Sequence, residues 1–437
     1  MPEIKAFKGY VYNSSMVEPS KVVAPPYDVI NSEEQDALYR LDPCNVVRLI
    51  LGKENQGDSE NNNKYTRAAA FLREWVDKGI ITQQSESSIY LYEQEFTLPD
   101  GSRKVRKGFI ALVKLDEPGK GSIFPHENTL AKPKEDRLNL MRACKGNLCQ
   151  VFSLYTDSER KVDRLLEKGK PSKPVFDFID PSGLVNRLWQ VSSPEVIEEV
   201  RKTMAEKNLF IADGHHRYET AVNYRNEMRK STGKNNGNEP FDYVTMMFVN
   251  TEDEGLVVLP IDRLIHSVKD FSSKNVLKKM GELFNITPVA EGTDAETLSK
   301  LVAEKGKETP SFGVALEGEK GYFIAGLKSR AVADSCFEPG FPVELKELDV
   351  SILHKLIFEK VLGIDEESLK NQTNIEYVKG GGLTIKHFKE GNYQAAFLLN
   401  PTPADGVKRV AEKGLKMPQK STFFYPKLLS GIVFNLF

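Results

Sequence analysis

The chain has 437 residues, more than one typical domain holds, so we expect two or three domains. Its formal net charge of −2 excludes a broad basic field for holding a nucleic acid duplex, and we expect no nucleic acid partner. No apolar run approaches the roughly 18 residues of a membrane span, so we expect no membrane partner. Four cysteines without zinc-ribbon or CxxC spacing are typical of a reduced protein, which favours a cytoplasmic location.

In chain order, the first clear elements are a helix and a hairpin. A polar, Gly- and Asn-rich loop at 52–64 precedes an amphipathic helix at 65–80. Two alternating stretches, 87–98 and 104–115, flank an Asp-Gly turn and predict a β-hairpin. The elements expected after the hairpin are helix 132–145, strand 149–157, helix 159–169, strand 184–193, helix 194–207, strand 208–212, helix 215–230 and strands 241–250 and 256–266.

The pattern after Ser267 is mixed. We expect a hairpin at 313–327, a helix with an apolar face at 347–363 and a strand at 392–401. Helices interleaved with hairpins favour an α+β class with mixed sheets over a regular βαβ array.

The most informative stretch follows the apolar strand at 208–212 and opens a helix; it reads Asp213, Gly214, His215, His216, Arg217. The glycine suits a sharp turn and lets a ligand approach the backbone closely. The N–H groups in the first turn of a helix have no intrahelical partner, and the helix dipole is positive there. The motif therefore predicts an anion site, with phosphate as the usual ligand. The arginine adds a planar fork for phosphate oxygens, and the histidines add donors.

Two other interpretations of the histidine pair stay open. A zinc site is disfavoured because adjacent histidines at a helix start point in different directions, whereas helical zinc pairs lie about one turn apart. The plainer alternative is a capped helix start that carries two surface histidines.

A second segment, 122–147, concentrates polar and charged side chains: His126, Glu127, Asn128, Thr129, Lys132, Lys134, Arg137, Arg142 and Lys145. Its Pro-His-Glu step lies in a non-periodic loop, where the Glu127 carboxylate could act as a base. The basic residues of the helix that follows could complete an anion pocket. A solvated basic helix face is the alternative, and the sequence leaves it open.

Two weaker stretches are more typical of structural use. One is 22–30, with a double proline before Tyr27; the other is 417–431, where Tyr425 and Lys427 could still close over a charged substrate. The chain has no P-loop, no GxGxxG match and no GxSxG elbow. No signature of an adenine-ribose site stands out, which slightly favours pyrophosphate over a nucleotide as a phosphate ligand.

The stretch "ADGHHR" resembles the signature at the phosphate-binding helix of the ParB/sulfiredoxin superfamily, in the branch that holds the free-serine kinases. Together with "APPYDVI", "PHENT…KEDRL" and "KSTFFYPKL", it resembles a bacterial family long known only as a domain of unknown function, which contains pyrophosphate-dependent serine kinases. This second resemblance covers essentially the whole chain. Sulfiredoxins carry a reactive cysteine where His215 stands, so sulfinic-acid repair is disfavoured.

The resemblance implies a fold and a domain division. We expect an α+β protein whose mixed-sheet, ParB/sulfiredoxin-like core carries additional α/β elements. The expected parts are an N-terminal α/β segment at 1–85, a catalytic core at 86–266 and a C-terminal α+β domain at 267–437.

The resemblance also implies an activity: phosphorylation of free L-serine to O-phospho-L-serine with pyrophosphate, ADP or ATP as donor and Mg²⁺ as cofactor. Glu127 and Asp213 are the expected catalytic residues, and which of them is the base stays open. The expected phosphate-binding residues are Gly214, His215, His216, Arg217, His126, Lys132, Arg137 and Arg142. The expected substrate-binding residues are Asp213, Asn128 and Thr129, and no metal ligands are assigned.

Two rival functions use the same anion site. One is a non-catalytic regulator that binds a nucleotide or phosphometabolite; the other is a metal-dependent phosphatase or nuclease. The sequence leaves the oligomeric state open.

Overall fold

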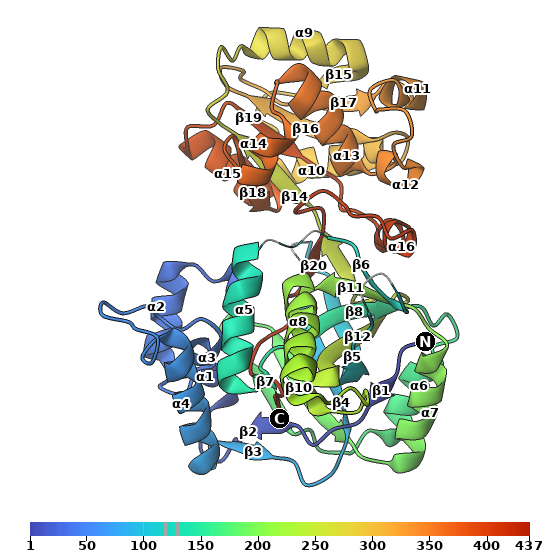
Figure 1. Ribbon diagram of the computed structural model, residues 1–437. Coiled ribbons are helices and arrows are strands. Elements are labelled where there is room, and N and C mark those ends of the chain that lie inside the picture. The colour runs from blue at the N-terminus through green and yellow to red at the C-terminus, as the bar shows by residue number, and fades with distance from the viewer. Residues whose placement is uncertain (99, 118–119, 128, 130) are drawn as a thin grey trace. The chain divides into compact units, whose positions relative to one another are not determined.

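The computed structural model describes residues 1–98, 100–117, 120–127, 129 and 131–437, which form two compact units (Figure 1). The first unit comprises Met1–Pro125, Thr129–Val257 and Pro426–Phe437. The second comprises Val258–Tyr425 together with His126 and Glu127. Residues that follow the second unit in the chain therefore belong to the first.

A mixed sheet lies at the centre of the first unit. Its strands follow the order β6-β11-β8-β12-β5-β4-β10-β9, and β1 pairs with β5. β6 is parallel to β11 and β8 is parallel to β12, whereas the other neighbours are antiparallel. The expected α+β class with a mixed sheet is confirmed. The strands are β1 (Ile4–Lys5), β4 (Ile89–Thr97), β5 (Arg103–Lys114), β6 (Ile123–Pro125), β8 (Val151–Tyr155), β9 (Phe176–Ile179), β10 (Val185–Val191), β11 (Leu209–Asp213) and β12 (Tyr243–Asn250).

Helices pack against this sheet and against each other. α6 lies beside α7, and α5 lies beside α8 (Figure 1). One apolar core joins Phe109 and Phe248 of the sheet to Val200 of α7 and Tyr218 of α8, and a second core surrounds Trp75 of α4. The helices are α1 (Pro19–Val22), η1 (Tyr27–Val29), α2 (Ser32–Leu41), α3 (Val47–Ile50), α4 (Lys64–Asp77), α5 (Ala131–Cys144), α6 (Lys161–Gly169), α7 (Pro194–Ala205), α8 (His215–Thr232) and η2 (Pro240–Asp242).

The capping and glycine residues that predicted these elements lie at the ends of the helices, as expected. The side chain of Asn63 accepts from the backbone of Thr66 and caps α4. Helix α8 begins after Gly214 and ends before Gly233, both in left-handed backbone conformations. The helices expected at 65–80 and 215–230 and the hairpin expected at 87–98 and 104–115 are confirmed within a few residues.

Short strand pairs complete the first unit. β2 pairs with β3, and β7 pairs with β21, which follows the second unit in the chain. These strands are β2 (Tyr10–Tyr12), β3 (Ile81–Gln83), β7 (Gly146–Asn147) and β21 (Asn435–Leu436).

The second unit is built on an antiparallel sheet of order β15-β17-β16-β19-β14-β18. Two short strands, β13 (Val257–Leu259) and β20 (Phe423–Tyr425), pair with each other. The sheet strands are β14 (Ile261–Ile265), β15 (Phe284–Pro288), β16 (Ser311–Leu316), β17 (Phe323–Leu327), β18 (Ile375–Lys379) and β19 (Ala395–Leu398). The helices are α9 (Ser273–Leu283), α10 (Ala295–Gly306), α11 (Arg330–Asp334), α12 (Val343–Lys346), α13 (Asp349–Ile352), η3 (Leu353–Val361), α14 (Glu366–Asn371), α15 (Gly381–Glu390) and α16 (Ala404–Glu412).

The helix expected at 347–363 is present, but most of it is a π-helix. The first turn, α13, is followed by the π-helix η3, whose hydrogen bonds join residues five apart. One of them is the 2.9 Å bond from the Leu362 N–H to the Ile357 carbonyl. Apolar spacing predicts a helix in this range but does not separate a π-helix from an α-helix, because the two bury nearly the same positions over so short a run.

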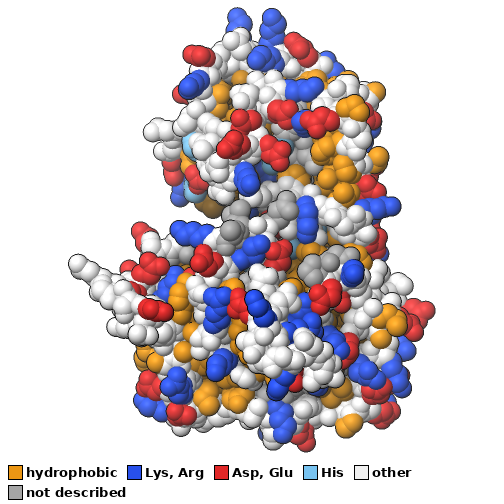
Figure 2. Space-filling view, in the orientation of Figure 1, with side chains coloured by type: hydrophobic (Ala, Val, Ile, Leu, Met, Phe, Trp, Pro, Cys, Tyr) orange, Lys and Arg blue, Asp and Glu red, His pale blue; other side chains and the backbone are white. Residues whose placement is uncertain are grey.

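Charge is dispersed over the surface. On the face drawn in Figure 2, basic and acidic side chains intermix, in keeping with the small net charge. None of the helices among the described residues has the length and hydropathy needed to cross a membrane.

Candidate active site

The Asp-Gly-His-His-Arg segment lies at the junction of β11 and α8 in the first unit. The register of β11 shifts between Ile211 and Asp213, and Asp213 ends the strand opposite Phe152 of β8. Gly214 then takes φ 87° and ψ 29°. A Cβ at this position would also lie 2.8 Å from Nε of Arg217. The positive φ therefore favours glycine here, and a Cβ at this position would displace the flexible end of Arg217.

The carboxylate of Asp213 is mostly buried and has two cationic neighbours. Its Oδ2 lies 3.4 Å from Nη2 of Arg217 and 3.4 Å from Nζ of Lys427. Burial alone raises the pKa of Asp213, but Lys427 and Arg217 outweigh it and hold that pKa below its ordinary value. Asp213 is therefore ionised at neutral pH.

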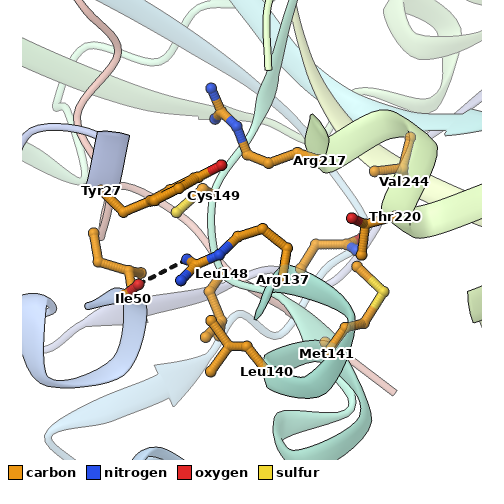
Figure 3. A pocket seen from close by; sticks show the side chains of 12 residues that line it. Tyr27, Ile50, Arg137, Leu140, Met141, Leu148, Cys149, Arg217, Thr220 and Val244 are labelled. Atoms are coloured by element: carbon orange, nitrogen blue, oxygen red, sulfur yellow. Dashed lines mark hydrogen bonds between the residues drawn. The ribbon is translucent and has the colours of Figure 1, made fainter. Parts of the chain in front are cut away.

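Arg217 reaches from the first turn of α8 into a small cavity of about 50 Å³. Its Nη1 donates to the carbonyl of Gln150. Figure 3 shows Tyr27, Arg137 and Cys149 around the same cavity. The Arg137 guanidinium carbon lies 3.9 Å from the centre of the Tyr27 ring. Three stretches singled out in the sequence, 22–30, 132–145 and 213–217, thus meet at one place.

The two histidines differ in exposure. His215 is 4 % exposed, whereas His216 is partly exposed. In the part of the chain that the structure describes, no three histidine, cysteine or carboxylate side chains could share a metal ion. The zinc interpretation therefore gains no ligand set from the described residues.

Three other residues expected to bind phosphate, Lys132, Arg137 and Arg142, are spread along α5. Arg137 is buried, and its Nη1 donates to the Ile50 carbonyl at 2.7 Å. Lys132 is exposed, and Arg142 is half-exposed in a bidentate pair with Glu227 of α8, at 2.6 and 3.0 Å. The structure brings Arg137 to the cavity of Arg217 and places Arg142 in a surface ion pair.

The residues expected to contact substrate are Thr129 and Asn128, and Asn128 lies outside the described residues. The Thr129 hydroxyl donates to Oε2 of Glu219 at 2.5 Å, and Nζ of Lys134 lies 3.1 Å from the same oxygen. Both contacts tie the start of α5 to α8.

Glu127 belongs to the second unit, where it lies against the turn that contains Met417 and Lys420. The Met417 N–H donates to the His126 carbonyl at 2.8 Å, and the Lys420 N–H donates to Oε1 of Glu127 at 3.3 Å. Lys420 has φ 56°, and its carbonyl accepts from Nη2 of the buried Arg263 at 3.0 Å. His126 is 2 % exposed.

Arg106 is a residue at this site that sequence reasoning missed. Its side chain is fully buried on β5, 4.9 Å from the Phe152 ring, and its Nη2 donates to Gln94. Burial lowers the pKa of Arg106 to about 10, while Tyr92, Asp253 and Asp213 act in the opposite direction. In the sequence it stands in an alternating strand among other cations, "RKVRK", so no local signal marks it as buried.

Comparisons with known proteins give a family and weak structural likenesses. The model of a family described as "Protein of unknown function (DUF1015)" matches residues 4–351. No curated protein matches the chain significantly. A free serine kinase in complex with AMP is 12 % identical, with a TM-score of 0.33 over 72 % of this chain and 86 % of that one.

Two further solved structures are similar at the same level. A conserved hypothetical protein from Pyrococcus furiosus is 11 % identical, with a TM-score of 0.32 over 73 % of this chain and 92 % of that one. SbnI with a C-terminal truncation, from Staphylococcus aureus, is 10 % identical, with a TM-score of 0.32 over 74 % and 85 %. Likenesses this distant carry no argument about chemistry, which has to come from the residues of the site.

Proposed function

The chain belongs to the DUF1015 family of proteins of unknown function, and we propose that it is a phosphotransferase that phosphorylates free L-serine to O-phospho-L-serine. The observation that carries the proposal is the Asp213-Gly214 turn, which places a buried carboxylate and Arg217 at the N-terminus of the 18-residue helix α8. The phosphoryl donor is pyrophosphate, ADP or ATP.

The N-terminus of α8 supplies the phosphate site. Its first N–H groups have no intrahelical acceptor, and the helix dipole favours an anion there. Gly214 has no side chain to block the approach, and Arg217 brings a guanidinium beside it. His215 and His216, in the same turn, add donors. Phosphoryl transfer depends mainly on positioning and on positive charge around the moving group, and this turn offers both.

Two carboxylates act on serine, the phosphoryl acceptor. Asp213 binds the ammonium group or orients the hydroxyl of serine, and Glu127 is the general base. In the step, the serine Oγ–H proton passes to the carboxylate. The Oγ–P bond forms while the P–O bond to the donor's leaving group breaks, and the leaving phosphate, AMP or ADP keeps the electron pair.

Magnesium fits this site only as an ion that arrives with the donor. The described residues hold no cluster of three possible ligands, and Asp213 is the carboxylate at the anion site. One carboxylate is enough for Mg²⁺, because this ion keeps several waters and takes its remaining ligands from substrate phosphates. When bound, it would neutralise charge on the donor oxygens.

The test is a product assay on the full chain. Purified protein is incubated with L-serine and Mg²⁺ and with pyrophosphate, ADP or ATP in turn, and phosphoserine is detected by mass spectrometry. We expect phosphoserine with at least one donor. Absence of product with every donor overturns the proposal. Donor binding without turnover would favour a regulator, and release of phosphate without serine would favour a phosphatase.

A further inference from the structure

Arg263 is a buried arginine of the second unit whose guanidinium bonds to main-chain carbonyls. It stands on β14 and is 1 % exposed. Its Nη2 donates to the Lys420 carbonyl at 3.0 Å and its Nη1 to the Ile261 carbonyl, while Nε has no hydrogen-bond partner among the described residues. Asp262 and Tyr377 favour the charged form electrostatically, but burial outweighs them and lowers the pKa of Arg263 to about 10.

A buried guanidinium of this kind is unfavourable for the stability of the unit. Arg263 forms no ion pair with a carboxylate among the residues that the structure describes. Buried ions without such a partner are costly, and apolar side chains of similar volume are often at least as stabilising. Residues that break a local rule in this way are expected mainly at functional sites. The position of Arg263 therefore indicates a role beyond packing.

The turn at 417–421, which contains Lys420, contacts the segment that carries Glu127. The Met417 N–H donates to the His126 carbonyl at 2.8 Å, and the Lys420 N–H donates to Oε1 of Glu127 at 3.3 Å. All four residues belong to the second unit. Two main-chain donors to the segment of the proposed base thus stand on the turn that Arg263 contacts.

The conformation of Lys420 relates the contact with Arg263 to the contact with Glu127. The N–H and the carbonyl of Lys420 are joined through one Cα, and its φ of 56° lies in the left-handed region, which is disfavoured for lysine. Such a residue persists only when the surrounding structure holds it. Arg263 holds its carbonyl, and the Thr402 hydroxyl donates to the Ser421 carbonyl at 2.9 Å. Loss of Arg263 lets Lys420 relax to a right-handed or extended conformation, which turns its N–H away from Glu127.

We propose that Arg263 is a positioning residue for Glu127, which it holds through the main chain of Lys420. This inference rests on the proposed function, in which Glu127 is the general base, and adds a residue that does not touch the substrate. A base acts in the chemical step, so its displacement lowers kcat and leaves the KM values for L-serine and the donor nearly unchanged.

The experiment measures the kinetics of phosphoserine formation by the full chain and by Arg263→Met. We expect kcat to fall by about fivefold, roughly the worth of the hydrogen bond from Lys420 to Glu127, with both KM values retained. Arg263→Lys, which keeps a charged donor, should recover part of kcat. Lys420→Val already disfavours the left-handed backbone, so Arg263→Met should lower kcat no further in that background.

The matched control is Thr384→Val, a change on the opposite face of the same strand. Thr384 is fully buried, and its hydroxyl donates to Oδ2 of Asp262 at 2.8 Å. Asp262 and Arg263 are consecutive on β14, so their side chains point to opposite faces of the sheet. We expect Thr384→Val to keep the kcat of the unmodified protein, and thermal melts verify that each variant is folded.

Hydrogen exchange tests the contact without reference to catalysis. Mass spectrometry of the peptide that contains Met417 and Lys420 should show faster amide exchange in Arg263→Met than in the unmodified protein or in Thr384→Val. Unchanged exchange in Arg263→Met overturns the inference. So does an equal loss of kcat in Arg263→Met and Thr384→Val, or a further loss when Arg263→Met is added to Lys420→Val.

The same measurements separate this inference from the proposed function. If the unmodified protein forms no phosphoserine with any donor, the proposed function is wrong, and exchange alone decides whether Arg263 holds the turn against Glu127. If phosphoserine forms and Arg263→Met keeps both kcat and the exchange rates, the proposed function stands and the role of Arg263 is wrong.

Discussion

The two carboxylates proposed for catalysis lie in different units and are held in different ways. Asp213, in the first unit, has two side-chain cations near one oxygen and is 16 % exposed. Glu127, in the second unit, accepts a main-chain N–H from Lys420 on one oxygen. Cations beside a carboxylate keep it ionised and suit it to binding another charged group, which favours Asp213 as a binding group. Glu127 remains the proposed base.

The backbone beside each carboxylate also differs. Gly214 and Lys420 both take positive φ angles, 87° and 56°. Glycine adopts this conformation without strain, but a lysine there is disfavoured by roughly 1–2 kcal/mol. The strained turn at Lys420 is stabilised by contacts elsewhere, including the Arg263 guanidinium on its carbonyl.

The largest expected effect is the loss of turnover on substitution of Glu127, and it distinguishes a catalytic base from a binding group. Glu127→Gln keeps the shape of the side chain but removes the base, so turnover should fall by about 100-fold or more. Donor affinity, measured by calorimetry, should stay the same, because the donor site lies in the first unit. Asp213→Asn should instead weaken L-serine binding. Near-normal turnover of the Glu127→Gln variant would transfer the role of base to Asp213.

A second test compares buried carboxylates of the two units by pH. Burial opposes ionisation of Asp136, but Arg137 and Lys64 lower its pKa to about 2; burial raises the pKa of Asp262 to about 6. Asp136 therefore stabilises the fold above pH 4, and this contribution is lost as pH falls towards 2. The pH dependence is reversed for Asp262, because its pKa is raised in the folded state. Its contribution to the free energy of unfolding is present below pH 4 and is lost as pH rises through 6.

The matching substitutions should have opposite effects in urea unfolding. Asp136→Asn should destabilise at pH 7 by about 1 kcal/mol, since the group is partly exposed, and should have no effect near pH 2. Asp262→Asn should stabilise above pH 6 by up to about 3 kcal/mol and should have little effect below pH 4. Effects of the same sign at pH 7 would contradict the assigned pKa directions.

The third prediction concerns the glycine beside Asp213. Gly214→Ala adds a Cβ at positive φ and only 2.8 Å from Arg217 Nε, so the guanidinium has to move away from Asp213 and Gln150. We expect donor affinity to fall by about tenfold, roughly one charge-assisted hydrogen bond. The control is Gly233→Ala at the other end of α8, where φ is also positive but no atom lies within 4 Å of the added Cβ. Equal donor affinities for the two variants would contradict the steric argument.

The smallest expected effect concerns the turn at Lys420. Lys420→Val and Lys420→Gly both remove the exposed ammonium and keep the N–H, but valine strongly disfavours the left-handed backbone. Valine should displace the N–H from Glu127 and lower kcat/KM by about fivefold, roughly the worth of one hydrogen bond. Glycine should leave kcat/KM unchanged. The same loss in both variants would point to the lost charge rather than to the backbone.

Local pattern was sufficient for much of the first unit. Periodicity predicted α4, α8 and the β4–β5 hairpin, and the Asp-Gly step predicted the helix start at Gly214. These features depend on neighbours in the sequence, so a single chain is enough to infer them. The catalytic and binding roles of the residues there stay predictions.

Contacts between residues far apart in the chain could not be predicted from the sequence in the same way. Arg106 looks like a surface cation of a strand, and only the packing of Phe152 and Gln94 around it makes it a buried one. Lys427 stood out as a cation, but its partner Asp213 lies more than two hundred residues earlier in the chain. The grouping of Glu127 with the turn at Lys420 has the same cause, because it depends on contacts between segments far apart in the sequence.

The first unit is completed last during synthesis, because its segment Pro426–Phe437 lies at the end of the chain. It carries Lys427 and β21 and buries Phe434 in the core around Trp75, yet it is translated after the whole of the second unit. At about 5–20 residues per second, the ribosome needs roughly 8–34 seconds for residues 258–425. During that time the first unit lacks a core segment and the Asp213 site lacks a cation. The apolar surface that Phe434 covers in the finished protein is therefore exposed in the nascent first unit. We expect a chaperone that binds apolar surface to bind the nascent chain during this interval.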